Sequence, residues 1–162
     1  MSNNEEKLWH LIRDIHNCMM VTKEPSGAMR ARPMHAFVEP ERKEIWFYTR
    51  LDNGKSIELQ ENGDICLCFS SPSDSDYISI SGHASLDDDR QMIDKHWSPF
   101  VDAWFPEGKD SPVVGMIRVA VDKGEYWDGK SGSIVSAIRM LVAAETDEMP
   151  DLGDHGKVAI SR

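Results

Sequence analysis

The stretch CMMVTKEPSGAMRARPMHAFVEPERKEIWFYTR, residues 18–50, decides the fold class of this chain. It contains three runs rich in β-branched, aromatic and sulfur-containing side chains, a composition typical of strands: 18–23, 28–38 and 45–50. Two polar turn signals separate them, Glu24-Pro25-Ser26-Gly27 and Glu39-Pro40-Glu41-Arg42. The stretch therefore predicts a three-stranded antiparallel meander.

Runs of the same kind continue along the chain at 64–70, 77–86, 113–122 and 125–128. In the run 77–86, isoleucines alternate with polar residues, which indicates a strand with one dry face. Lys123-Gly124 lies between the last two runs, so we expect a final hairpin that turns there.

Apolar side chains near the start of the chain have the helical spacing i, i+3, i+4 and i+7, at Leu8, Leu11, Ile12 and Ile15. They predict an amphipathic helix over residues 5–16 that caps one end of the molecule. We also expect a short helix over 55–62 and another over 133–144. A further helix should begin after Asp87-Asp88-Asp89, because carboxylates are favoured at a helix N-terminus.

The expected strands follow one another with short turns between them, and the chain has no alternating β–α–β units. This order excludes a doubly wound parallel sheet and favours a small antiparallel barrel of about six or seven strands with peripheral helices. Residues 1–144 are expected to form this single domain. Residues 145–162 are rich in acidic side chains and are expected to be a mobile C-terminal tail.

The chain has 162 residues and a formal net charge of -10, with 28 acidic against 18 basic side chains. A field of this sign repels the phosphate backbone, so nucleic-acid binding is not expected. No apolar run reaches the length needed to cross a bilayer, and the polar start, Met1 to Lys7, is unlike a signal peptide. We therefore expect a cytoplasmic protein.

The three cysteines, Cys18, Cys66 and Cys68, form no even-numbered disulfide framework, and the last two are spaced unlike a zinc knuckle. In an apolar strand, burial would keep Cys66 and Cys68 reduced and inert. The histidines form no cluster at metal-ligand spacing, so no metal centre is expected. His35 and His83 lie on expected strands, where each could be a haem ligand or a proton donor, although packing is the commoner role.

Two arginines, Arg30 and Arg32, are two residues apart in an expected strand, so their side chains share a face about 6 to 7 Å apart. Like charges side by side favour an anion, while a solvated outer face explains the pair equally well. Pro33 follows directly. A proline within a strand belongs at an edge or a bulge, where a backbone can approach a ligand.

The segment from Tyr48 to Ser56 combines a strand end, an Asn53-Gly54 turn and a helix that begins with Lys55. Free N–H groups, the positive helix end and an ammonium group meet there, which suits a phosphate. A nucleotide-binding P-loop is excluded, because its first glycine would have to stand at Thr49. A lysine that merely starts a surface helix is the alternative interpretation.

Aromatic side chains gather in two late segments of the chain, at Trp97, Trp104, Phe105, Tyr126 and Trp127. Large flat rings serve either a core or the walls of a site for a planar ligand, and a single ring is more often part of the core. Together with the arginines and the phosphate-suited turn, they favour a phosphorylated planar cofactor.

A series of short motifs resembles, in order and spacing, the landmarks of the FMN-binding split-barrel proteins related to pyridoxamine 5'-phosphate oxidase, especially their general stress protein 26 branch. The motifs are Ala31-Arg32-Pro33-Met34, residues 45–49, Lys55 and its helix, residues 79–84, residues 104–108 and Tyr126-Trp127-Asp128. The resemblance covers residues 5 to 130. It implies a mainly β fold, an antiparallel split β-barrel with peripheral helices.

The same resemblance implies a homodimer with two FMN molecules at the subunit interface, each touched by both chains. Carried over by position, Arg32 and Lys55 would hold the FMN phosphate, and Thr49 and Asn53 would add polar contacts. A guanidinium and an ammonium group suit this dianionic phosphate.

The remaining cofactor-binding candidates implied by the resemblance concern the flavin ring. The residues that would border the ring or the ribityl chain are Pro33, Met34 and Tyr48. Tyr77 would lie near the cofactor, and Trp104 and Trp127 would approach the ring from the partner subunit.

The resemblance further implies an FMN-dependent oxidoreductase that acts on a small-molecule or nicotinamide donor. Such an enzyme needs no dedicated acid–base pair, because the flavin itself transfers the hydride or electrons. Asp128-Gly129-Lys130 follows Trp127, where pyridoxamine phosphate oxidases carry a substrate-binding arginine and histidine, so oxidation of vitamin B6 is not expected. Two alternatives stay open. One is an FMN-binding stress protein that stores or senses flavin without turnover, and the other is a split-barrel relative that binds haem or the deazaflavin F420.

Overall fold

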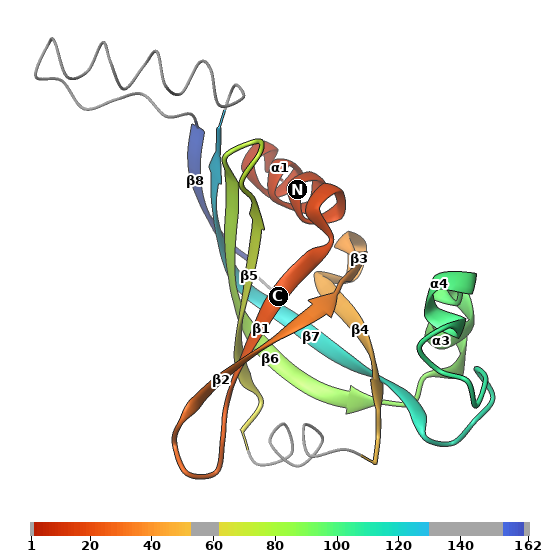
Figure 1. Ribbon diagram of the computed structural model, residues 1–162. Coiled ribbons are helices and arrows are strands. Elements are labelled where there is room, and N and C mark those ends of the chain that lie inside the picture. Colours follow the sequence, from red (N-terminus) through yellow and green to blue (C-terminus); the bar gives the residue numbers. More distant parts are fainter. Residues whose placement is uncertain (1, 53–61, 130–153, 161–162) are drawn as a thin grey trace, which may run out of the picture.

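A computed structural model describes residues 2–52, 62–129 and 154–160 of the chain. In this part a curled antiparallel sheet has the strand order β2-β1-β5-β6-β7-β4-β3, with β8 paired to β7 (Figure 1). The strands are β1 (Asn17–Lys23), β2 (Met29–His35), β3 (Phe37–Glu39), β4 (Glu44–Arg50), β5 (Asp64–Ser71), β6 (Asp76–Asp87), β7 (Val114–Asp128) and β8 (Asp154–Ala159). The helices are α1 (Asn3–Ile15), α3 (Arg90–His96) and α4 (Pro99–Asp102), with a 3-10 turn at Pro40–Arg42. The mainly β, antiparallel split-barrel class is confirmed.

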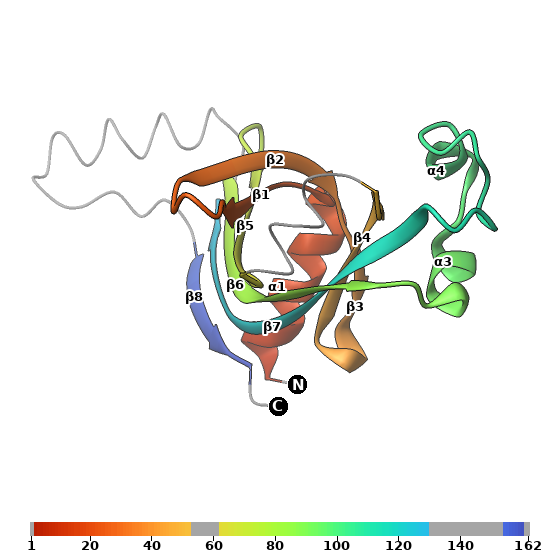
Figure 2. The same ribbon diagram turned by 90° about the horizontal axis from the view of Figure 1, so that it is seen from below.

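The amphipathic helix expected over residues 5–16 is confirmed as α1, and it lies in the concave side of the sheet (Figure 2). Ser2 caps the helix by accepting a hydrogen bond from the Glu5 N–H. The apolar stripe is buried, with Leu8 and Ile12 fully enclosed. This burial of one helix face against the sheet forms the main core.

The expected meander of three neighbouring strands is wrong. β1 pairs with β2 and β5, whereas β4 pairs with β3 and β7, so β2 and β3 lie at opposite ends of the strand order. The run 28–38 is broken at Ala36, whose N–H donates to the His16 carbonyl oxygen over 2.7 Å. The chain leaves one half of the sheet at that residue and enters the other.

The expected hairpin at Lys123-Gly124 is also wrong, because residues 114–128 form the single strand β7. A register shift against Ser81 and Gly82 places a bulge at Asp122. The extra residue inverts the alternation of buried and exposed positions, which mimics a turn in the sequence. Gly124 is required for packing instead, since a Cβ there would lie 2.5 Å from Leu8 Cδ2.

The expected mobile tail does not hold for residues 154–160. Asp154–Ala159 forms β8, which pairs antiparallel with β7, and Val158 and Ile160 are buried. The rest of the proposed tail, 145–153, lies outside the described residues. So do the helix expected over 133–144 and all but the last residue of the helix expected over 55–62.

A second apolar layer covers the outer face of β4 and β7. Trp46 and Met116 pack there against Met92 and Ile93 of α3, and Val114 packs against Val101 of α4 and Phe105. Asp89 caps α3 by accepting from the N–H groups of Gln91 and Met92, which confirms the helix start predicted from the acidic residues. None of the helices in the described ranges is long and apolar enough to cross a membrane.

Candidate functional site

A pocket of about 320 Å³ opens between the β2–β3 junction, β4 and α4. Aromatic side chains form most of its wall: His35, Phe37, Tyr48, Phe100, Trp104 and Phe105. Asn17, Pro33, Met34 and Val101 complete the lining. Flat rings around an apolar space of this size suit a planar organic ligand.

Tyr48 projects from the outer face of β4 and forms part of this wall. Its ring contacts Phe37 edge-on at 5.4 Å between centroids and lies 5.9 Å from Phe105. Its hydroxyl donates to the Ile93 carbonyl oxygen over 2.6 Å. Burial raises the pKa of Tyr48, so its phenol stays protonated and serves as wall and anchor.

His35 is a titratable side chain of the pocket. Its ring contacts Phe100 and Phe37 at 5.1 and 5.0 Å, and its Nδ1 lies 3.0 Å from Asn17 Oδ1. Burial, together with the nearby His16, lowers the pKa of His35 below its ordinary value. The lowered pKa favours the neutral imidazole at pH 7, and donation from Nδ1 to the Asn17 amide oxygen would leave Nε2 unprotonated.

The structure brings together four of the residues that the sequence analysis assigns to the flavin: Pro33, Met34, Tyr48 and Trp104 line the same pocket. The resemblance has Trp104 approach from a partner subunit, yet here it lines the pocket of its own chain and is 71% exposed. Its outer face is thus still open to another molecule.

Arg32 does not line this pocket. Its guanidinium donates to the buried Thr22 hydroxyl over 2.7 Å. Arg30, on the same face of β2, is ion-paired with Glu24 at 3.3 Å. The expected sharing of one strand face is therefore confirmed, while the two guanidinium groups have different partners.

Other candidate residues lie away from the pocket or cannot be placed. Thr49 is 3% exposed and points to the opposite side of β4 from Tyr48. Tyr77 and Trp127 are register partners on β6 and β7, both partly exposed. Asn53 and Lys55 lie outside the described residues, so their roles stay predictions.

Sequence reasoning missed Phe37 and Phe100 as parts of the pocket wall. Phe37 follows the break at Ala36, and Phe100 lies in the aromatic segment 97–105, of which only Trp97, Trp104 and Phe105 are candidates from the sequence. A proline at the first position of α4 and an aromatic residue beside it were the available signals for a short helix with an exposed ring.

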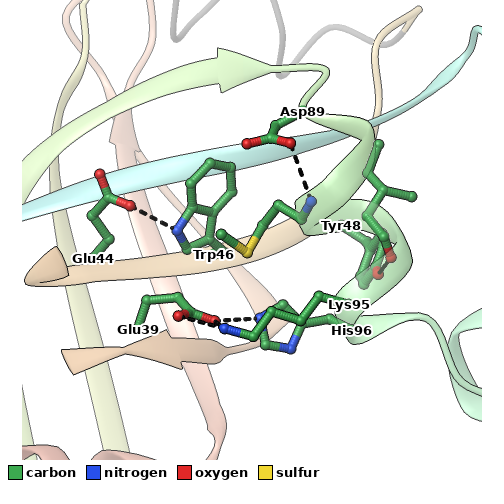
Figure 3. A network of polar contacts seen from close by, with 9 residues as sticks. Glu39, Glu44, Trp46, Tyr48, Asp89, Lys95 and His96 are labelled. Carbon is green, nitrogen blue, oxygen red and sulfur yellow. Dashed lines mark hydrogen bonds and ion pairs between the residues drawn. The ribbon is translucent and has the colours of Figure 1, made fainter. Parts of the chain in front are cut away.

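A polar network holds α3 against β3, next to the pocket (Figure 3). The Glu39 carboxylate accepts from Lys95 Nζ at 2.6 Å and lies 2.8 Å from His96 Nε2. Burial alone would raise the pKa of Glu39, but the hydrogen bonds from Lys95 and His96 outweigh it and lower the pKa. The network fixes the helix that receives the Tyr48 hydrogen bond.

Across the described residues, no group of three or more His, Cys, Asp or Glu side chains is arranged to hold a metal ion.

The sequence matches the profile of the family described as pyridoxamine 5'-phosphate oxidase like over residues 3–151.

Solved structures resemble this chain over most of its length. The general stress FMN/FAD binding protein of Xanthomonas citri is 32% identical, with a TM-score of 0.69 over 79% of this chain and 90% of that protein. A general stress protein 26 from Jannaschia sp. CCS1 is 24% identical, with a TM-score of 0.80 over 99% of this chain and 100% of that protein. At this identity, the similarity to the Jannaschia protein shows a shared fold.

A curated relative, protein bli-3 of Neurospora crassa, is 31% identical over 118 residues. The match covers 67% of this chain and 56% of that protein, so the chain spans little more than half of the relative's length.

Proposed function

This chain belongs to the pyridoxamine 5'-phosphate oxidase-like family, and from that premise we propose that it binds FMN and acts as an FMN-dependent oxidoreductase on a small-molecule or nicotinamide donor. The observation that carries the proposal is the shared pocket of Pro33, Met34, Tyr48 and Trp104. The 32% identity to a general stress FMN/FAD binding protein supports it.

The residues present fit a flavin by their chemistry. The pocket offers about 320 Å³ between flat apolar side chains, which suits a tricyclic ring. Arg32, one residue before the pocket-lining Pro33, supplies a guanidinium for a phosphate. Lys55 is proposed to add an ammonium group from outside the described residues.

Bound flavin would supply hydride and electron transfer, and the protein groups bind and orient it. The Tyr48 side chain would border the flavin ring, and its hydroxyl stays protonated. Phe100 and Trp104, both exposed, would border the ring and reduce its contact with water. The lowered pKa of His35 favours its neutral form at pH 7, so the pocket lining carries no charge next to the uncharged ring system.

The substrate of vitamin B6 oxidases is not part of this proposal. In place of the arginine and histidine expected after Trp127, this chain has Asp128, whose carboxylate forms an ion pair with Lys7 at 2.5 Å. A carboxylate that is paired with a lysine provides no positive charge for a substrate phosphate.

A homodimer that shares the flavin is also part of the proposal. The exposed rings of Trp104, Tyr77 and Trp127 support it, because exposed aromatic side chains are enriched at interfaces. Light scattering of the purified protein should give twice the mass of the chain. A cytoplasmic location is proposed too, since all three cysteines are free thiols.

The test is a titration of purified, flavin-free protein with FMN and with riboflavin, followed by flavin fluorescence. Arg32→Ala should weaken FMN binding by about 2 kcal/mol, roughly thirtyfold, and leave riboflavin binding unchanged, because riboflavin lacks the phosphate. Arg30→Ala is the matched control and should not alter either affinity. Wild-type protein that binds neither flavin, and takes up haem or F420 instead, would refute the proposal.

Turnover is tested separately by anaerobic mixing of the FMN-loaded protein with NADH or NADPH. Bleaching of the flavin absorbance within seconds supports an oxidoreductase. Stable FMN binding without bleaching by either nucleotide or by a panel of small organic donors would favour storage or sensing of flavin.

A further inference from the structure

Two thiols lie side by side on the outer face of the sheet, away from the aromatic pocket. Cys66 and Cys68 are two residues apart in β5, so their side chains share a face, and their Sγ atoms are 3.8 Å apart. Cys66 is half-buried and Cys68 is exposed. The expectation that both thiols are buried is therefore wrong for Cys68.

A third sulfur faces the same region. Met19 of β1 is the register partner of Cys68, and its side chain is 41% exposed. Directly opposed residues in antiparallel strands have Cβ atoms about 5 Å apart, within reach of a flexible thioether. The remaining thiol, Cys18, points into the core and is 5% exposed, and burial raises its pKa to about 12.

The strand backbone holds this arrangement in place. β5 is paired on both sides, with β1 and with β6, so the positions of Cys66 and Cys68 are fixed by two ladders of hydrogen bonds. On the β6 side, the Ser79 hydroxyl lies 3.7 Å from Cys66 Sγ. The two thiols are thus preorganised as a chelating pair without any movement of the main chain.

The separation of the sulfurs selects a coordination geometry. With a metal–thiolate bond of about 2.3 Å, two sulfurs 3.8 Å apart subtend an angle of about 110° at the metal. That angle suits a trigonal or tetrahedral centre and is far from a linear one. The ligands at hand are two thiols and a thioether, a soft set that disfavours oxygen-seeking ions. Thiolates bind both Cu(I) and Zn²⁺, and the thioether, which is not among the usual zinc ligands, favours Cu(I).

We propose that Cys66, Cys68 and Met19 form a surface site for Cu(I). Both thiols lose their protons to solvent, each thiolate forms a bond to the ion, and the Met19 sulfur donates a lone pair. Two protons are released per copper and no electron is transferred. None of its residues lines the aromatic pocket.

Protonation keeps the site inert until a metal displaces the protons. Burial raises the pKa of Cys68, and the neighbouring Cys66 raises it further. A thiol of this kind reacts slowly with electrophiles, since the thiolate is the nucleophile. A soft ion that binds thiolate strongly overcomes the cost of deprotonation.

The test is an anaerobic competition in which the purified protein, as isolated, is titrated against the coloured Cu(I)–bicinchoninate complex. Wild-type protein should remove one Cu(I) per chain. Cys66→Ser and Cys68→Ser should each lose this ability, and Met19→Leu should weaken it. Ser79→Ala, which alters the nearest polar neighbour without removing a sulfur, should compete as wild type does.

X-ray absorption of the copper-loaded protein should show three sulfur neighbours, and two in Met19→Leu. Wild-type protein that leaves the bicinchoninate complex intact would overturn the proposal, as would serine variants that still remove copper. Three sulfurs that persist in Met19→Leu would remove Met19 from the site. Circular dichroism of each variant verifies that a loss of binding is not a loss of fold.

Discussion

The hydroxyl of Tyr48 donates a hydrogen bond of 2.6 Å to the main-chain carbonyl oxygen of Ile93. This bond joins β4 to α3 and holds the Tyr48 ring as a wall of the aromatic pocket. The same residue thus links the stability of the helical layer to the shape of the candidate site.

Tyr48→Phe should lower the free energy of unfolding by about 1 kcal/mol, because it removes one partly buried hydrogen bond and keeps the ring. Flavin affinity should change little. Urea denaturation measures the effect, with Tyr77→Phe, at an exposed position on β6, as the control. Equal stability of the two variants would contradict a structural role for the Tyr48 hydroxyl.

Trp104→Ala should weaken FMN binding by about 1 kcal/mol, roughly fivefold, through loss of one aromatic wall. Its 71% exposure predicts little change in the melting temperature. Met29→Ala, at a residue 66% exposed on β2 and outside the pocket, is the control. A normal Kd for Trp104→Ala would exclude this ring from the flavin site.

Lys7→Met should destabilise the fold by about 1 kcal/mol. Lys7 Nζ lies 2.5 Å from Asp128 Oδ2 and 2.9 Å from Asp154 Oδ2, and it sits 5.4 Å above the Tyr126 ring. Burial lowers the pKa of Lys7, but the hydrogen bonds to both carboxylates outweigh it and raise the pKa, so the lysine is charged at all working pH values.

The control for Lys7→Met is Lys23→Met, at an exposed position on β1. This control should leave the melting temperature unchanged. Asp154→Asn should reduce the cost of Lys7→Met, because only one of the two carboxylates then loses the Lys7 ammonium group. Full additivity of the two substitutions would argue against a direct coupling.

Glu39→Gln should show a cost that depends on pH. The pKa of Glu39 is lower in the folded protein than in the unfolded chain, so its contribution is fully present above the unfolded value and is lost as pH falls through the folded value. The difference in unfolding free energy between wild type and variant should be present well above a carboxyl pKa of about 4 and should shrink below it. A difference that grows on acidification would contradict this sign.

Gly82→Ala should cost about 3 kcal/mol, since a Cβ at residue 82 would stand 2.4 Å from the Ala120 carbonyl oxygen in the neighbouring strand. The main chain would have to separate at the bulge. Ser81→Ala, one residue earlier on the same strand, serves as the reference in chemical denaturation. Equal denaturation midpoints for Gly82→Ala and Ser81→Ala would show that the pairing of β6 with β7 can relax at residue 82.

Local patterns in the chain predicted what local forces control. The apolar stripe of α1, the Asp89 cap and the alternation along β6 each depend on residues within one or two turns, and all three are confirmed. That Pro33, Met34 and Tyr48 lie together was predicted from the resemblance to the split-barrel family. Their approach to Phe37 and Phe100 depends on the break at Ala36 and on the placement of α4, which no nearby residue dictates.

The sequence by itself determined the antiparallel β class and most strand positions, because periodicity records which side of each element meets water. Only the tertiary structure decided that β1 pairs with β5 instead of continuing a meander, that β7 bulges at Asp122, and that Cys66, Cys68 and Met19 share one surface. Strand pairing depends on the packing of segments far apart in the chain. That free energy belongs to the whole sheet, so no single stretch of sequence contains it.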